Sequence, residues 1–180
     1  MRKTLGLLAI IFGMIAGSAT ARILSREEAL RLAFPEAQLQ SDVVFLTQQE
    51  IEEITRISGV KVETALVSRT VARQGSTIAG RAYLDTHIVR TKKESLLVIL
   101  DAEGKVRRVE VVAFLEPPEY LAPDRWYRQF EGKQMSEDLR IKRDIPSVTG
   151  ATLTAQATTD AVRRVLATDQ VLQKRQQEKP

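Results

Sequence analysis

One stretch of the sequence carries more hydroxyl groups than a helix start needs. The stretch SVTGATLTAQATTDAVRRVL covers residues 147–166, and its first eight residues place four hydroxyl side chains around a glycine: Ser147, Thr149, Gly150, Thr152 and Thr154. Serine and threonine favour helix N-terminal caps, but a helix gains little from several of them. The surplus indicates either a helix cap with more hydroxyl groups than it needs or a bound ligand.

The chemistry of this stretch suits a phosphate group. Gly150 allows the backbone to approach a ligand closely, and the threonines supply hydroxyl groups. The amphipathic segment that follows predicts a helix, whose N-terminus presents unpaired N–H groups and the positive end of its dipole. A threonine-rich turn and cap with no ligand explains the same residue types equally well. Residue types alone leave both interpretations open.

The sequence TGATLT at residues 149–154 resembles the flavinylation motif of the FMN-binding domain family. That family includes peripheral subunits of sodium-pumping NADH:quinone oxidoreductases and of the related Rnf complexes. The resemblance implies that the FMN phosphate is esterified to Thr152 by a magnesium-dependent flavin transferase, which takes it from FAD outside the cytoplasm. It further implies a phosphate seat formed by the residues around Thr152, namely Thr149, Gly150, Ala151, Leu153 and Thr154.

A second stretch extends the resemblance. FLEPPEYLAPDRWYRQFEGK, residues 114–133, is similar to the family segment in which a Glu-Thr-Pro-Gly turn precedes a tryptophan and a Phe-x-Gly-Lys sequence. The matching residues are Glu116, Pro118, Trp126, Phe130, Gly132 and Lys133, and the whole resemblance spans residues 80–166. It implies cofactor contacts from Glu116, Tyr120 and Trp126. For the aromatic residues, Phe130 included, core packing is the favoured alternative.

Two positions depart from the family pattern. Pro146 stands where the family carries an aspartate three residues before the first motif hydroxyl, and Glu119 replaces the turn glycine. The alternative to a flavoprotein is therefore an exported binding or assembly module that has the fold without the cofactor.

The N-terminus has the layout of a secretory signal. Arg2 and Lys3 precede an apolar run over residues 5–17, and small residues follow up to Ala21. We predict cleavage after Ala21 and export, to the periplasm where the cell has an outer membrane; the alternative is an uncleaved anchor. The domains are then a signal segment at 1–21, an FMN-binding domain at 22–170 and a polar tail at 171–180.

Composition limits the function classes. The 180 residues are 43% hydrophobic and 28% charged, which suits one domain, and the absence of cysteine excludes disulfides, lipoprotein anchoring and cysteine catalysis. Loss of residues 1–21 lowers the formal charge from +4 to +2, and only 5% of residues are aromatic. Because a nucleic-acid surface needs a basic stripe with stacking residues, we expect no nucleic-acid partner. His87, the single histidine, is expected to be a structural or surface residue and not a catalytic one, and we predict neither catalytic nor metal-ligating residues.

The elements that must position these residues form an α+β fold. Capping boxes at Ser25 and Thr47 predict two helices, which end near residues 34–35 and at Gly59. Strands are predicted at 60–71 and 79–90, followed by a hairpin over 95–116 that turns at 101–104. A short helix at 124–130 and a long helix from about Thr154 complete the chain, with fraying expected over 173–180. The sequence thus predicts one antiparallel sheet with packed helices in a single domain after the signal segment.

Together these features predict an exported electron-transfer domain with covalent FMN. Its partners would be the flavin transferase and a membrane-bound redox protein. A chain of 180 residues leaves no room for a second substrate domain, so we expect a carrier and not a self-sufficient reductase.

Overall fold

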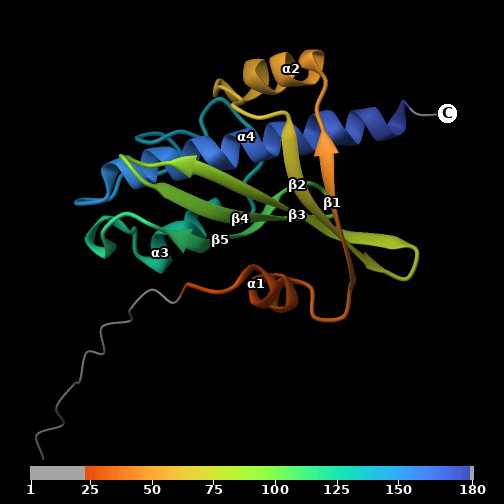
Figure 1. Ribbon diagram of the computed structural model, residues 1–180, viewed down its shortest axis with the longest axis horizontal. Helices are drawn as coiled ribbons and strands as arrows, with labels where there is room; N and C mark the ends of the chain where they lie inside the picture. The colour runs from red at the N-terminus through yellow and green to blue at the C-terminus, as the bar shows by residue number, and fades with distance from the viewer. Residues whose placement is uncertain (1–22, 179–180) are drawn as a thin grey trace, which may run out of the picture.

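The computed structural model describes residues 23–178 (Figure 1). The elements follow the order α1 (Arg26–Ala33), β1 (Gln38–Phe45), α2 (Gln48–Ser58), β2 (Leu66–Gln74), β3 (Thr77–Ile88), β4 (Lys93–Asp101), β5 (Val106–Phe114), η1 (Pro118–Tyr120), α3 (Asp124–Tyr127), η2 (Arg128–Phe130) and α4 (Thr152–Gln177). The predicted signal segment lies outside the described residues. Among residues 23–178, no helix has the length and apolar character required to cross a membrane.

The five strands form one antiparallel sheet in sequence order, β1-β2-β3-β4-β5. Helices α2 and α4 cover one face, and α1 covers part of the other (Figure 1). Strand β4 shows why two faces are covered: Leu96, Val98 and Leu100 pack toward α4, whereas Leu97 and Ile99 pack toward α1, and all five side chains are fully buried. This layered arrangement confirms the predicted α+β fold with helices packed on an antiparallel sheet.

Most of the predicted elements are present. Both capping boxes form at the starts of α1 and α2, and Gly59 ends α2 in the left-handed conformation with a φ of 67°. The predicted hairpin is β4–β5. The predicted helix at 124–130 forms as one helical turn, α3, followed by the 3-10 turn η2.

Two strand predictions were incomplete. Strand β1 was missed because it is an exposed edge strand in which only Val44 is buried, so its apolar alternation is weak. Strand β2 begins at Leu66 and not at residue 60, because residues 60–65 lead from the end of α2 back to the sheet.

The predictions for the last helix also need correction. Helix α4 begins at Thr152, two residues earlier than predicted, and continues through Gln177. The expectation that the polar end frays was wrong up to residue 177, because Leu172 is fully buried and Val171 packs against the same core. A 26-residue helix therefore spans the sheet, and its first turn carries the threonine-rich stretch.

Candidate functional site

The turn before α4 requires its glycine for backbone geometry. Gly150 has a φ of 84°, in the left-handed region that residues with a side chain rarely adopt, and a Cβ built there would meet no heavy atom within 4 Å. The backbone at Gly150 thus faces open space. Thr152 follows as the first residue of α4, exposed, with its hydroxyl donating to the Val148 carbonyl at 3.3 Å.

The first turn of α4 is not capped by a side chain of the described part of the chain. Its N-cap residue is Ala151, which has no side chain able to accept a hydrogen bond, and the turn contains no acidic residue. The first N–H groups of a helix have no intrahelical partners, so they need caps, water or a ligand. This helix start therefore offers open amide donors at the positive end of the helix dipole, which is the arrangement that binds phosphate.

The predicted phosphate-seat residues do not all face outward. Thr149 and Leu153 are exposed, but Ala151 is buried and contributes through its backbone. Thr154 is also buried, and its hydroxyl donates to the Tyr120 carbonyl at 2.6 Å. This bond contradicts the prediction that the Thr154 hydroxyl would bond the phosphate. Its role is instead to fix the start of α4 against the loop that contains η1.

Trp126 supports the turn from the inside. The indole ring is buried and meets Tyr127 and Phe130 edge to face, with ring centroids 5.3 and 5.4 Å apart. Its Nε1 donates to the Pro146 carbonyl at 2.8 Å, which holds the chain just before the hydroxyl-rich stretch. Core packing is thus the interpretation that the structure supports for Trp126 and Phe130.

Glu116 ties two loops together. Its carboxylate is buried and accepts hydrogen bonds from the backbone N–H groups of Arg90, Thr91 and Lys92 at 3.2, 2.7 and 2.7 Å. These donors lower the pKa of Glu116, so the carboxylate is ionised at neutral pH. Tyr120, a few residues on, has the Arg90 guanidinium 4.3 Å from its ring centre. Glu116 and Tyr120 therefore position the loops beside the start of α4.

Beside the first turns of α4 lies a cleft that the sequence analysis did not find. Its volume is about 440 Å³, and it runs between α4, strands β2 and β3, and residues 60–64. Leu153, Gln156 and Ala157 line it from α4, while Ile88 lines it from the end of β3 and Val89 from the turn that follows. Residues four apart lie on one helix face, so Gln156 lies on the same face as Thr152. On α4 the cleft thus begins at Leu153, the residue next to Thr152.

A buried polar network forms one wall of this cleft. His87 contacts Asp85 through Nδ1 at 2.9 Å and Glu94 through Nε2 at 3.1 Å, and Arg164 of α4 donates two hydrogen bonds to Asp85. Burial opposes the charge on His87, but the two carboxylates outweigh it and raise the pKa of the imidazole to about 9. Asp85 has a pKa below its usual value because these hydrogen bonds outweigh its burial. His87 is therefore held as a cation between two carboxylates.

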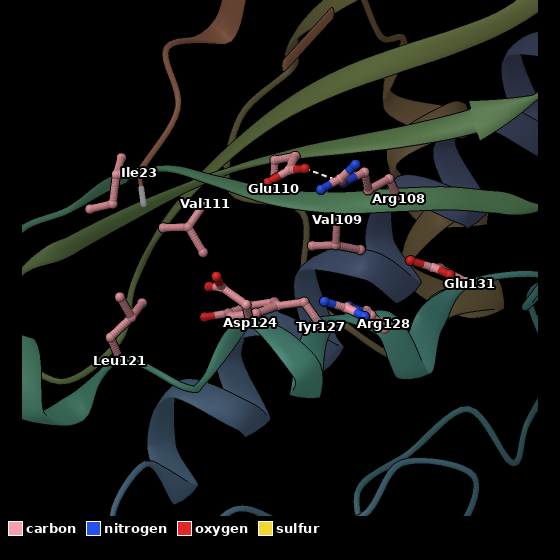
Figure 2. A pocket seen from close by; sticks show the side chains of 10 residues that line it. All are labelled: Ile23, Arg108, Val109, Glu110, Val111, Leu121, Asp124, Tyr127, Arg128 and Glu131. Carbon is pink, nitrogen blue, oxygen red and sulfur yellow. Dashed lines mark ion pairs between the residues drawn. The ribbon is translucent and has the colours of Figure 1, made fainter. Parts of the chain in front are cut away.

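A second and smaller pocket lies between β5 and α3 (Figure 2). Val109 and Val111 point from β5 toward Tyr127 on α3, and Arg108 pairs with Glu110 on the other side of the strand. The pocket measures about 60 Å³ and shares no residue with residues 147–156. Its size excludes a flavin.

Comparison with known proteins identifies the segment that contains this helix start. Residues 91–167 match the family model described as FMN-binding domain. The match covers 77 of the 180 residues of the chain. Searches of curated proteins and of solved structures found no match.

The match confirms the family resemblance and supports FMN as the cofactor, with a flavin-dependent role in electron transfer. The matched segment contains Glu116, Tyr120, Trp126 and the whole of residues 149–154. The walls of the cleft contributed by β2 and β3 lie outside it, so they belong to the part of the chain that the family model does not describe.

Proposed function

We propose that this protein carries FMN covalently through a phosphoester to Thr152, and that it relays electrons outside the cytoplasm to or from a membrane-bound redox partner. The observation that carries the proposal is the uncapped start of α4, where an exposed threonine hydroxyl follows Gly150 within a matched FMN-binding domain. A flavin transferase needs an accessible acceptor, and Thr152 is exposed.

The residues at this helix start fit a phosphate monoanion or diester. Open N–H groups of the first turn and the helix dipole favour negative charge, and the absence of an acidic residue in that turn avoids repulsion. Exposed Thr149 offers a further hydroxyl. In the attachment reaction the Thr152 oxygen forms a bond to the FMN phosphorus of FAD, the bond to AMP breaks, and the hydroxyl proton is released.

The cleft beside Thr152 would hold the flavin ring. Leu153, Ile88 and Val89 provide apolar walls next to the attachment point, and Gln156 adds a polar group on the same helix face as Thr152. When bound, FMN accepts and donates one or two electrons, and attachment through its phosphate leaves the ring unmodified. The chain's task is then to orient the ring and to shield one side of it from water.

Covalent attachment suits an exported carrier. The signal-like N-terminus supports export of the domain, and outside the cytoplasm a dissociated flavin would not be replaced from a cytoplasmic pool. A tethered flavin remains with the protein during repeated electron transfer. A domain of this size with one cofactor site is a carrier between partners.

The test is the replacement of the acceptor oxygen. Thr152→Val, produced with a flavin transferase and exported, should lose all flavin fluorescence on a denaturing gel, because the phosphoester has no acceptor. Thr149→Val is the matched control and should retain the fluorescent band, since that hydroxyl only supports the phosphate. A fluorescent band in Thr152→Val contradicts the assignment.

The alternative is a module that has the fold without the cofactor, and the observation in its favour is Pro146 at the position of the family's aspartate. Wild-type protein that stays colourless with an active transferase would support this alternative. In that case Pro146→Asp should restore the fluorescent band if the proline alone blocks the transferase.

A further inference from the structure

We propose that two adjoining loops at the α4 start, residues 88–93 and 114–121, bind the surface of an anionic membrane. We call these loops together the basic tip. The proposal goes beyond the redox role, because it assigns a lipid-binding surface. Ile88 and Val89 also line the cleft assigned to the flavin ring, whereas the other residues of the basic tip do not.

The basic tip exposes apolar side chains that the fold does not use. Ile88 is 60% exposed and Leu115 is 59% exposed. The Leu115 N–H donates to the Lys93 carbonyl at 3.0 Å, so the two loops lie side by side. Pro117 and Pro118 next to Leu115 are also exposed. Exposed apolar groups gathered together and rimmed by charge mark contact surfaces.

The charges around these apolar groups are mainly positive. Arg90, Lys92 and Lys93 are all exposed, and none of them forms an ion pair with any residue of the range 23–178. Within the two loops Glu119 is the one exposed carboxylate, since Glu116 is buried against three backbone amides. Unpaired lysines beside apolar side chains complement a bilayer with anionic head groups.

The N-terminal end of the described chain lies at the same place. Ile23 lines the small pocket of Figure 2 together with Val111 and Leu121, so the chain enters the domain beside the second loop of the basic tip. Twenty-two residues precede it, including the apolar run at 5–17.

The basic tip is also held in a fixed shape. The ionised Glu116 carboxylate fixes residues 90–92, and Arg90 packs over the Tyr120 ring. The Thr154 hydroxyl then joins the Tyr120 carbonyl to the first turn of α4. Docking of the basic tip would therefore hold the FMN site at the bilayer surface. This consequence rests on the proposed function, whereas membrane binding by the basic tip does not depend on it.

Because the natural chain contains no cysteine, a single introduced cysteine gives a unique labelling site. We would label Leu115→Cys with an environment-sensitive fluorophore in the full-length chain. The matched control is Ser76→Cys in the β2–β3 turn, at the opposite end of the sheet (Figure 1). Each protein is mixed with vesicles of phosphatidylcholine alone or of phosphatidylcholine with phosphatidylglycerol as the anionic lipid.

The expected result is a blue shift and increased emission at residue 115 but not at residue 76, and only with the anionic vesicles. Adding Lys92→Gln and Lys93→Gln should weaken partitioning of the labelled chain on the order of thirtyfold, because each lysine near an anionic surface contributes a factor of about five. Residues 1–22 are present in every variant, so differences between variants report the basic tip.

Three results would overturn the proposal: no change at residue 115, an equal change at residue 76, or a change that is indifferent to lipid charge. Any of them would leave a protein partner as the occupant of these exposed side chains. Repeating the measurement with Thr152→Val separates this proposal from the redox role, since lipid binding should persist in a chain that cannot carry flavin.

Discussion

The first turn of α4 and the middle of the same helix are built from different chemistry. The first turn has no side-chain cap and no acidic residue, and it exposes Thr152 and Leu153. The middle is buried and crosses the sheet with charged groups that all find partners within the fold. One helix therefore combines a rigid, internally satisfied segment with an end whose backbone donors remain available.

Two arginines and an aspartate show how the middle is fixed. Arg163 is 1% exposed and donates to the carbonyls of Ser58 and Ser136 at 2.7 and 2.8 Å, and burial lowers its pKa. Asp169 accepts two hydrogen bonds from Arg81 and one from the Tyr83 hydroxyl. These bonds attach α4 to the end of α2, to the segment after η2 and to strand β3. They stabilise the helix independently of its N-terminal turn.

The N-termini of α1 and α2 also differ from the open N-terminus of α4. Both of those helices close their N-termini with complete capping boxes, from Ser25 to Glu28 and from Thr47 to Glu50. A missing cap costs about 1 kcal/mol, which a long buried helix tolerates easily. The open end of α4 is therefore consistent with a site preserved for a ligand on a rigid element.

The largest expected effect on stability comes from the middle of α4. Asp169→Ala leaves Arg81 buried without its partner and should lower the free energy of unfolding by about 3–5 kcal/mol. Urea unfolding followed by circular dichroism measures this change. Asp160→Ala, a partly exposed aspartate of the same helix, is the control and should change stability by less than about 0.5 kcal/mol. Equal losses of unfolding free energy in the two variants would show that the buried contacts in the middle of α4 are not what stabilises the protein.

The next effect concerns pH and the His87 network. The folded state raises the pKa of His87 from 6.5 to about 9, so this stabilisation is complete below pH 6.5 and is lost as the pH rises through 9. The loss should reach at most about 3 kcal/mol, with Asp85, Glu94 and Arg164 as the charged groups that face the ring. Unfolding measured from pH 6 to pH 10 should show this decline in the wild type and a flatter profile in His87→Gln. A decline of the same steepness in both proteins would assign it to other groups.

A cap that is satisfied within the chain should behave differently from the open one. Thr47→Ala removes the capping box of α2 and should lower the free energy of unfolding by about 1 kcal/mol. Flavin loading should remain unchanged, as measured by the ratio of flavin to protein absorbance after export. A large loss of flavin in this variant would indicate that the two helix starts are coupled.

The smallest expected change in stability comes from a variant that should clearly slow the attachment of flavin. Leu153→Glu places an acid in the first turn of α4, where the helix dipole should stabilise the protein by about 0.5 kcal/mol. The same charge repels the incoming phosphate, so flavin transfer should be slower than in the neutral control Leu153→Gln. Equal transfer rates in both variants would mean that the phosphate does not use this end of the helix.

The sequence predicted the parts of the fold that depend on local chemistry. The boxes at Ser25 and Thr47, Gly59 and the β4–β5 turn are each encoded by a few adjacent residues, and the structure contains all of them. Strand β1 was missed because an exposed edge strand lacks apolar alternation, and the end of α4 was missed because its polar side chains conceal the buried Leu172.

The site was predicted only in part, for a similar reason. The hydroxyl-rich turn can be recognised along the chain, but the partners of its residues come from distant segments. Thr154 bonds the Tyr120 carbonyl 34 positions away, and Arg164 reaches Asp85 at a separation of 79 residues. The cleft is formed by three segments that are distant in the sequence, so no local sequence pattern predicts it. The one signal available was the mixture of His87 with nearby acids on a predicted strand.

The most direct test of the account is peptide mapping of the exported wild-type protein made with a flavin transferase. Tryptic digestion releases residues 144–163, and fragmentation of this peptide by mass spectrometry locates any adduct. The account predicts one FMN phosphoester on Thr152. An unmodified peptide, or an adduct on Thr149 or Thr154, would contradict it.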